Sequence, residues 1–90
     1  MRITLKQLEY FVAAGEMGSI KLAATRINIS QQSISSAISH LEREFGVQLF
    51  VRHHAQGLAL TSAGKTMLRE AKLMLRQAQG LYTMAGELNN

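Results

Sequence analysis

The feature that most restricts the fold of this chain is a connection of only three residues, "NIS" at 28–30, between two amphipathic segments. Ser19 precedes the first segment and Ser30 precedes the second, and serine is a preferred N-cap of helices. Apolar residues of the second segment recur at spacings of three and four, at Ile34, Ala37, Ile38, Leu41 and Phe45. Two helices joined this tightly predict a helix-turn-helix pair, and Gly46 supplies the left-handed residue that ends the second helix.

The N-terminal segment predicts a further helix ahead of this pair. "TLKQ" at 4–7 is a capping box, in which the side chains of Thr4 and Gln7 each satisfy the backbone amide of the other residue. An apolar face at helical spacing follows, and we expect this helix to end near Gly15, with "EMGS" as the turn. Three helices are therefore expected before residue 46.

The rest of the chain begins with a predicted β-hairpin. "VQLFVR" and "GLALT" are short apolar runs with strand character, and "HHAQ" with Gly57 forms the loop between them. Thr61 then caps a long helix that runs to about Leu88. The predicted fold is mainly α, with a winged helix-turn-helix domain of three helices and a two-stranded wing at 1–60, followed by a long linker helix at 61–90.

The long helix carries an apolar face wider than one small domain can cover. Such a helix is roughly 40 Å long and outruns a domain of this size. We expect its first turns, near Met67 and Leu68, to pack on their own domain and the remainder to pack on a second copy of the chain. A flanking stripe repeats every seven residues, at Met67, Met74, Leu81 and Leu88. The predicted dimer seam itself consists of Leu68, Ala71, Leu75, Ala78, Tyr82 and Ala85.

The outer face of the helix after Ser30 is unlike an ordinary solvated surface. No Lys, Arg, Asp or Glu lies between Arg26 and Glu42, whereas solvated helix faces are rich in Glu, Lys, Arg and Ala. Short hydroxyl and amide side chains let a helix approach the floor of the DNA major groove, where Gln pairs with adenine and Ser contacts several bases. This face is predicted to contain Gln32, Ser36, Ser39 and Arg43, flanked by Ser33, Ser35 and His40.

The net charge of +4 and the sequence pI near 10.0 favour a polyanionic partner such as nucleic acid. Many basic proteins bind no polyanion, so the positions of the charges carry more weight than their sum. The basic residues flank the uncharged helix, which fits an interface where phosphate contacts position the protein and base contacts specify the sequence. The candidate phosphate and wing contacts are Lys21, Arg26, Arg43, Arg52, His53 and His54.

Other functional classes find little support. "AGKT" at 63–66 and "SAGK" at 62–65 resemble parts of enzyme signatures but lack the surrounding motif and fold. The adjacent pair His53–His54 has no third ligand for a metal, so neither a metal nor a cofactor is expected. The chain contains no cysteine, no secretion signal and no apolar run near the roughly 20 residues of a membrane span. We expect a cytoplasmic protein that is not an enzyme.

The motifs described above together resemble the DNA-binding domain of LysR-type bacterial transcriptional regulators. The resemblance covers practically the whole chain and rests on ordered elements at matching spacing. These are "LKQLEYFVAAGEMGS", the pair Ala23–Ala24, "SQ" at 30–31, Ser35, "LE" at 41–42, Gly46, "LF.R" at 49–52 and "LT.AG" at 60–64.

The resemblance implies a dimer paired through the linker helix and a tetramer in the full-length protein. It further implies binding to double-stranded DNA at an interrupted inverted repeat, under control of a small-molecule inducer. The inducer-binding domain would follow the linker helix and is absent from this chain. Arg52 falls on the family's wing contact, and the family's DNA-reading positions fall on Gln31, Gln32, Ser33, Ser35 and Ser36.

Several residues depart from the family's pattern, and one alternative function stays open. Gln32 stands where the family often has Pro, Ser36 where many members carry Arg or Lys, and Lys21 where Ser or Thr is common. The wing sequence "HHAQG" is also a variant form. The alternative is a winged-helix dimerisation or protein-interaction module that does not read DNA, because a fold does not settle function.

Overall fold

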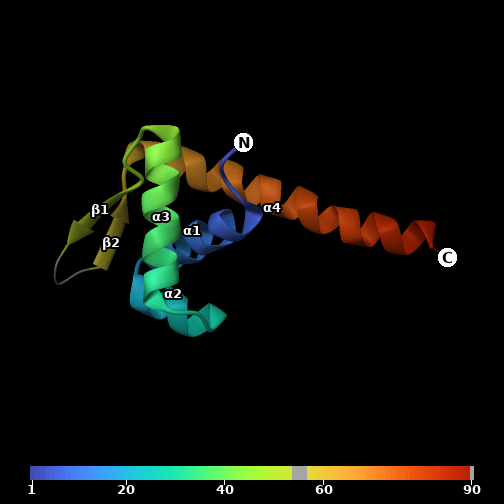
Figure 1. The fold of residues 1–90 in the computed structure, drawn as a ribbon, viewed down its shortest axis with the longest axis horizontal. Coiled ribbons are helices and arrows are strands. Elements are labelled where there is room, and N and C mark those ends of the chain that lie inside the picture. The colour runs from blue at the N-terminus through green and yellow to red at the C-terminus, as the bar shows by residue number, and fades with distance from the viewer. Residues whose placement is uncertain (54–56, 90) are drawn as a thin grey trace.

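The computed structural model describes residues 1–53 and 57–89, and for Arg52 and His53 it describes the backbone alone. Three helices precede an antiparallel two-stranded wing, and a long helix follows the wing (Figure 1). This order confirms the predicted winged helix-turn-helix with a helical extension. The elements are α1 (Leu5–Met17), α2 (Ile20–Ile27), α3 (Gln31–Phe45), β1 (Phe50–His53), β2 (Gly57–Leu60) and α4 (Ser62–Leu88).

Each of these helices begins at the N-cap predicted for it. In every case the hydroxyl of a Ser or Thr accepts a hydrogen bond from the backbone amide three residues later, which satisfies one of the free N–H groups of the first turn. The full capping box is present at the start of α1, where the Gln7 side chain also accepts from the Thr4 amide at 2.9 Å. The four caps are Thr4, Ser19, Ser30 and Thr61.

The predicted end of α1 near Gly15 was wrong, because the helix continues to Met17. Gly18 ends it, with a left-handed φ of 65° and an amide that donates to the Ala14 carbonyl. Gly15 instead lies where α4 passes over α1, and a Cβ there would come within 3.2 Å of the Leu68 side chain. The missing side chain of Gly15 thus permits close helix packing and does not break the helix.

The wing also begins later than predicted, at Phe50 and not at Val47. The Glu42 carboxylate of α3 accepts a hydrogen bond from the Leu49 amide at 2.8 Å, which holds the chain beside α3 before it enters the strand. In the sheet, Phe50 pairs with Leu60 and Val51 pairs with Ala59. The wing is therefore attached to α3 by a side chain as well as by the backbone.

The core lies between α1, α3 and the base of the wing. The largest fully buried side chains are Phe11, Ile34, Ile38, Leu41 and Leu49. Phe11 of α1 meets Phe50 of β1 edge to face, with ring centroids 5.6 Å apart. Burial of three such α3 side chains stabilises the fold by roughly 1.5–3 kcal/mol each. The inner face of α3 is consequently fixed against the rest of the domain.

The junction between the wing and α4 depends on a glycine. The Thr61 amide donates to the Leu49 carbonyl at 3.0 Å, and the Thr61 hydroxyl donates to the Gln48 carbonyl. A Cβ on Gly64 would lie 2.1 Å from the Leu49 carbonyl oxygen, a distance that no side chain tolerates. This close approach explains why glycine stands in the first turn of α4, where it lowers helix propensity.

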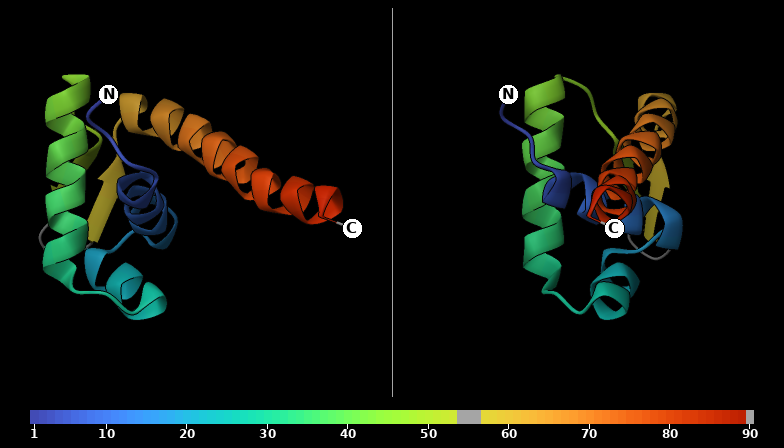
Figure 2. Two further views of the ribbon diagram at one scale, coloured as in Figure 1. Left: turned by 45° about the vertical axis from the view of Figure 1, so that its right-hand side comes forward. Right: turned by 90° about the vertical axis from the view of Figure 1, so that its right-hand side faces the viewer.

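The long helix α4 divides into a packed part and a protruding part. Ala71 is buried, and Leu68 and Leu75 pack against the same core. Toward its C-terminus the helix extends past the other helices, as the left view of Figure 2 shows. The molecule consequently measures 52 × 27 × 19 Å along its principal axes. Within the described part of the chain, no helix is long and apolar enough to cross a membrane.

Candidate nucleic-acid interface

The outer face of α3 presents polar side chains to solvent, opposite its buried stripe. Gln31, Gln32, Ser33 and Ser36 are exposed, while Ser35 and Ser39 are half-buried. The opposite face of the same helix buries Ile34, Ala37, Ile38 and Leu41. Because the buried stripe fixes the rotation of the helix, all the predicted base-contacting residues lie on the accessible side of α3.

The first turn of α3 ties one of these residues to the helix cap. The Ser30 hydroxyl accepts from the Ser33 amide at 3.0 Å, and the two serine hydroxyls share a hydrogen bond of 2.8 Å. Ser30 is therefore a cap, as predicted. The Ser33 hydroxyl has one local partner, so fewer of its hydrogen-bonding sites are directed outward.

One turn further on, Gln32 and Ser36 interact directly. The Gln32 amide nitrogen donates to the Ser36 hydroxyl at 3.3 Å, across the i, i+4 spacing of the helix. A shallow hollow along this side of α3 is lined by Gln32, Ser35, Ser36, Ser39 and Arg43. Five of the predicted contact residues thus share one concave strip of surface.

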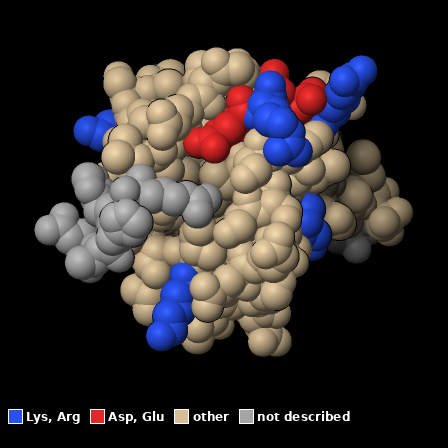
Figure 3. All heavy atoms as spheres, turned by 60° about the vertical axis from the view of Figure 1, so that its left-hand side comes forward, with Lys and Arg blue, Asp and Glu red and all other residues tan. Residues whose placement is uncertain are grey.

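Apart from Arg43, the residues that line this strip are uncharged. On the face drawn in Figure 3 most of the surface is uncharged, acidic side chains gather in one area, and several Lys and Arg lie toward the margins. Lys21, in the first turn of α2, and Arg43, in the last turn of α3, are both exposed. The strip therefore carries one charge, that of Arg43, and Lys21 is an exposed cation of the preceding helix.

Arg26 lies in different surroundings from the other candidate cations. Its guanidinium contacts the Met17 sulfur at 4.0 Å, and the residue lines a hollow between α1, α2 and α4 with Glu9 and Glu16. The structure does not bring Arg26 into the strip that contains Arg43.

The wing candidates are only partly described. The backbone of Arg52 and His53 lies in β1, opposite Leu58 and Gly57 of β2. His54 and the side chains of Arg52 and His53 lie outside the described residues, so their predicted contacts stay predictions. The base of the wing is anchored at the turn after α1, where the Leu58 amide donates to the Gly18 carbonyl at 3.0 Å.

Two residues of α3 have roles that the helical wheel alone did not reveal. His40, expected beside the outer face, is half-buried, and its Nε2 forms a hydrogen bond with the Arg2 carbonyl. Glu42 holds the start of the wing through the Leu49 amide, as described above. A wheel shows which face a residue occupies, but it does not show which segment distant in sequence covers that face.

The predicted seam residues of α4 fall into two groups. Leu68, Ala71 and Leu75 pack against the core of their own domain, further along the helix than expected. Ala78 is half-buried, and it lines a mostly apolar groove with Leu5, Leu81, Tyr82 and Ala85. The side chains of Leu81 and Tyr82 are 63% and 76% exposed. The protruding part of α4 therefore has an uncovered apolar face.

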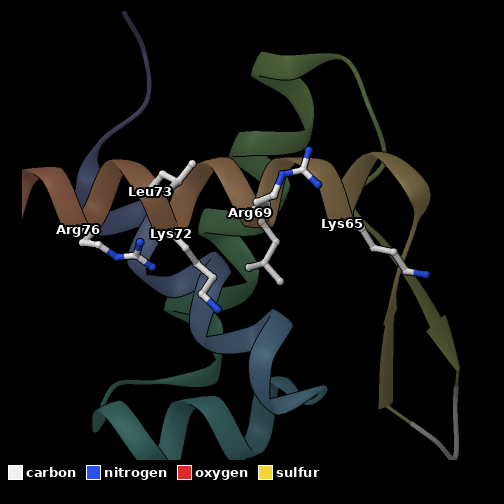
Figure 4. Close-up of a pocket in the computed structure, with 6 residues that line it drawn as sticks. Lys65, Arg69, Lys72, Leu73 and Arg76 are labelled. Atoms are coloured by element: carbon white, nitrogen blue, oxygen red, sulfur yellow. The ribbon is translucent and has the colours of Figure 1, made fainter.

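The polar side of α4 is built quite differently from the outer face of α3. Long cationic side chains leave the helix in several directions, with Lys65 near the wing and Lys72 directed toward α1 (Figure 4). Lys72 forms an ion pair of 2.9 Å with Glu16. Both partners are largely exposed, and such pairs contribute about 0–1 kcal/mol to stability.

Within residues 1–53 and 57–89, no group of three His, Cys, Asp or Glu could hold a metal ion.

Comparison with known proteins gives consistent matches. A sequence profile described as "Bacterial regulatory helix-turn-helix protein, lysR family" matches residues 5–65. The chain is 47% identical over 70 residues to the HTH-type transcriptional regulator ClcR of Pseudomonas putida, and the alignment covers 78% of this chain and 24% of ClcR. This chain therefore spans only a quarter to a third of the length of such curated relatives.

Two solved structures that contain DNA share this fold. The chain matches the CbnR_DBD–DNA complex with a TM-score of 0.91 and 33% sequence identity, over 98% of this chain and 100% of that chain. It matches the BenM_DBD/catB site 1 DNA complex with a TM-score of 0.91 and 30% identity, over 98% of both chains. The similarity in both cases extends over α4 as well as the winged helix.

Proposed function

The chain belongs to the LysR family of bacterial regulatory helix-turn-helix proteins, and we propose that it is the sequence-specific DNA-binding domain of a transcriptional regulator. In this proposal α3 enters the major groove, and the wing lies beside the backbone or the minor groove. The relatives named above are a transcriptional regulator and two domains solved with DNA, which supports DNA as the partner.

The observation that carries the proposal is the neutral, short-chained outer face of α3. Its exposed residues donate and accept hydrogen bonds but hold no charge until Arg43 near the helix end. Hydroxyl and amide groups suit base edges, because base edges present both donors and acceptors. We assign base contacts to Gln31, Gln32, Ser33, Ser35, Ser36 and Ser39.

Phosphate contacts are assigned to two exposed cations of the helix-turn-helix pair. Lys21 and Arg43 are exposed and belong to the helices of the helix-turn-helix pair. Arg52 is retained as the wing contact on the basis of its place in the sequence. Arg26 also stays a candidate because it is exposed, although its hollow contains Glu9 and Glu16 and lies apart from the strip on α3.

Fluorescence anisotropy with fragments selected from a random duplex pool tests this function. Binding should weaken steeply between about 50 and 200 mM salt, because each phosphate contact displaces condensed counterions. Arg43→Ala should weaken binding to all sequences alike and make the salt dependence shallower by about one contact. A chain that enriches no sequence, or that binds without salt dependence, would favour the interaction module that does not read DNA.

We also propose that the protruding part of α4 pairs two chains. The groove formed by Leu5, Ala78, Leu81, Tyr82 and Ala85 is apolar and uncovered in the single chain. An exposed apolar strip of this kind marks an interface when it lies on a helix that extends beyond its own core. A dimer would present two α3 helices to DNA and thereby match an inverted repeat.

Sedimentation of Tyr82→Asp tests this pairing. The variant is expected to have the mass of a single chain, whereas Gln77→Asp, an equal charge change on the same helix, should keep the mass of the dimer. Leu75→Asp is not a suitable test, because Leu75 packs on its own core and its loss would also unfold the domain. A dimer that survives Tyr82→Asp would exclude this part of α4 as the seam.

Further assignments concern the complete regulator. We propose that it is a cytoplasmic tetramer whose inducer binds a domain beyond α4. The operator selection described above also tests the pairing of two chains, because the symmetry of the selected sites reports the arrangement of the dimer.

A further inference from the structure

The hydrogen bond between Gln32 and Ser36 gives α3 a defined pattern of donors and acceptors. Gln32 Nε2 donates to Ser36 Oγ at 3.3 Å, and both residues are exposed at the hollow on α3. Free glutamine side chains rotate among several rotamers, which costs entropy when one of them is fixed. A partner one helical turn away reduces this freedom before any ligand arrives.

The groups left over on this pair follow from simple counting. The Gln32 amide has two N–H donors and one carbonyl oxygen, and one N–H is used toward Ser36. One N–H and the carbonyl oxygen of Gln32 therefore stay available to a ligand. The Ser36 oxygen accepts that bond, so its own O–H is available as a donor.

We infer that Gln32 and Ser36 act as one recognition unit for an adenine in the major groove, with Ser36 positioning the Gln32 amide. Adenine presents an N7 acceptor beside an N6 donor, which complements the remaining N–H and carbonyl oxygen of Gln32. Guanine presents two acceptors at this edge and would place one of them against the Gln32 oxygen. This inference rests on the proposed DNA-binding function and specifies which base the pair selects.

The neighbouring residues support the assignment to this pair in particular. The Ser33 hydroxyl is engaged by the Ser30 cap, and Ser35 and Ser39 are half-buried. No charged residue precedes Glu42 in α3, so the first turns of the helix, where the pair lies, carry no charged side chain. Gln32 is therefore an exposed amide of the outer face that has a hydrogen-bonding partner, Ser36, one helical turn away.

The experiment measures base preference at each position of the selected half-site. Wild-type chain is titrated against duplexes in which every position carries each of the four base pairs. One position should prefer adenine by roughly tenfold, the size expected of a bidentate contact. Both Gln32→Ala and Ser36→Ala should remove this preference, and the double variant should resemble the single ones to within about twofold.

The controls separate positioning from a general loss of structure. Ser36→Thr keeps the hydroxyl and should retain the adenine preference, whereas Ser36→Ala removes the acceptor without lowering helix propensity. Gln77→Ala, in the exposed part of α4, should change no base preference.

Two results would overturn the inference and leave the proposed function intact. The first is an adenine preference that survives Ser36→Ala. The second is that Gln32→Ala and Ser36→Ala change base preference at different positions of the half-site, with additive effects in the double variant. A wild-type chain that selects no sequence at all would instead overturn the proposed function and the inference together.

Discussion

The two longest described helices, α3 and α4, differ in the residues of their outer faces. Both start at a hydroxyl N-cap and both bury an apolar stripe against the same core. The outer face of α3 holds hydroxyls and amides, whereas the polar side of α4 carries Lys65, Arg69, Lys72 and Arg76. Long charged side chains keep a helix soluble, while short neutral ones let another surface approach it closely.

The energetics explain how α3 tolerates such an outer face. Serine in place of alanine costs about 0.5 kcal/mol per residue in helix propensity. The buried side chains Ile34, Ile38 and Leu41 each contribute roughly 1.5–3 kcal/mol and offset that loss. The inner face of α3 therefore determines its stability, and the composition of its outer face can serve binding.

The strongest test of this division is Leu41→Ala on the inner face of α3. Leu41 is fully buried, so the truncation should lower the free energy of unfolding by about 2–5 kcal/mol. Leu73→Ala on α4, where the side chain is 43% exposed, should lower it by less than about 1 kcal/mol. Urea unfolding followed by circular dichroism measures both, and equal losses would mean that α3 is not held by its inner face.

A second comparison uses two glycines of the same helix. Gly64→Ala places a Cβ 2.1 Å from the Leu49 carbonyl oxygen and should destabilise the wing junction by about 1–3 kcal/mol. Gly80→Ala should stabilise the chain by up to about 1 kcal/mol, because alanine favours a helix more strongly than glycine. Apart from the local helix backbone, no atom of the described residues lies within 4 Å of a Cβ added at Gly80. Thermal unfolding of both variants measures the difference, and a stabilising Gly64→Ala would show that α4 does not approach Leu49 as described.

The smallest expected effect concerns the outer face itself. Ser36→Ala loses the exposed hydrogen bond to Gln32 but gains helix propensity, so the free energy of unfolding should change by less than about 0.5 kcal/mol. Differential scanning calorimetry of the free chain measures this change. A loss above about 2 kcal/mol would make Ser36 a structural residue and would weaken its assignment to DNA.

Much of the fold could be predicted from the sequence, because local signals and burial agreed. Caps at Ser19, Ser30 and Thr61, a left-handed Gly46 and a hairpin with its loop near Gly57 all have short-range causes. The rotation of α3 followed from its apolar stripe, which also determined the accessible side of the helix. Neighbouring residues in the sequence were sufficient to predict a boundary wherever a cap or turn residue sets it.

The remaining features depend on contacts between segments distant in sequence. The sequence around Gly15 predicts a helix end, whereas the packing of Gly15 against Leu68 becomes visible only with the path of α4. The position of Arg26 beside Glu9 and Glu16 depends in the same way on how α1 and α2 meet. The division of the α4 seam at Leu75 reflects where the domain ends, which the heptad pattern does not encode.

The central claim is that the neutral outer face of α3 is the surface that meets DNA. Ser36→Glu and Gln77→Glu add the same charge at exposed positions of α3 and α4, so both weaken general attraction to a polyanion equally. Anisotropy titrations with a selected operator should show at least about a hundredfold loss for Ser36→Glu, through charge repulsion and a blocked groove, and less than about threefold for Gln77→Glu. Equal losses in the two variants would contradict the claim, because the interaction would then depend on net charge and not on α3.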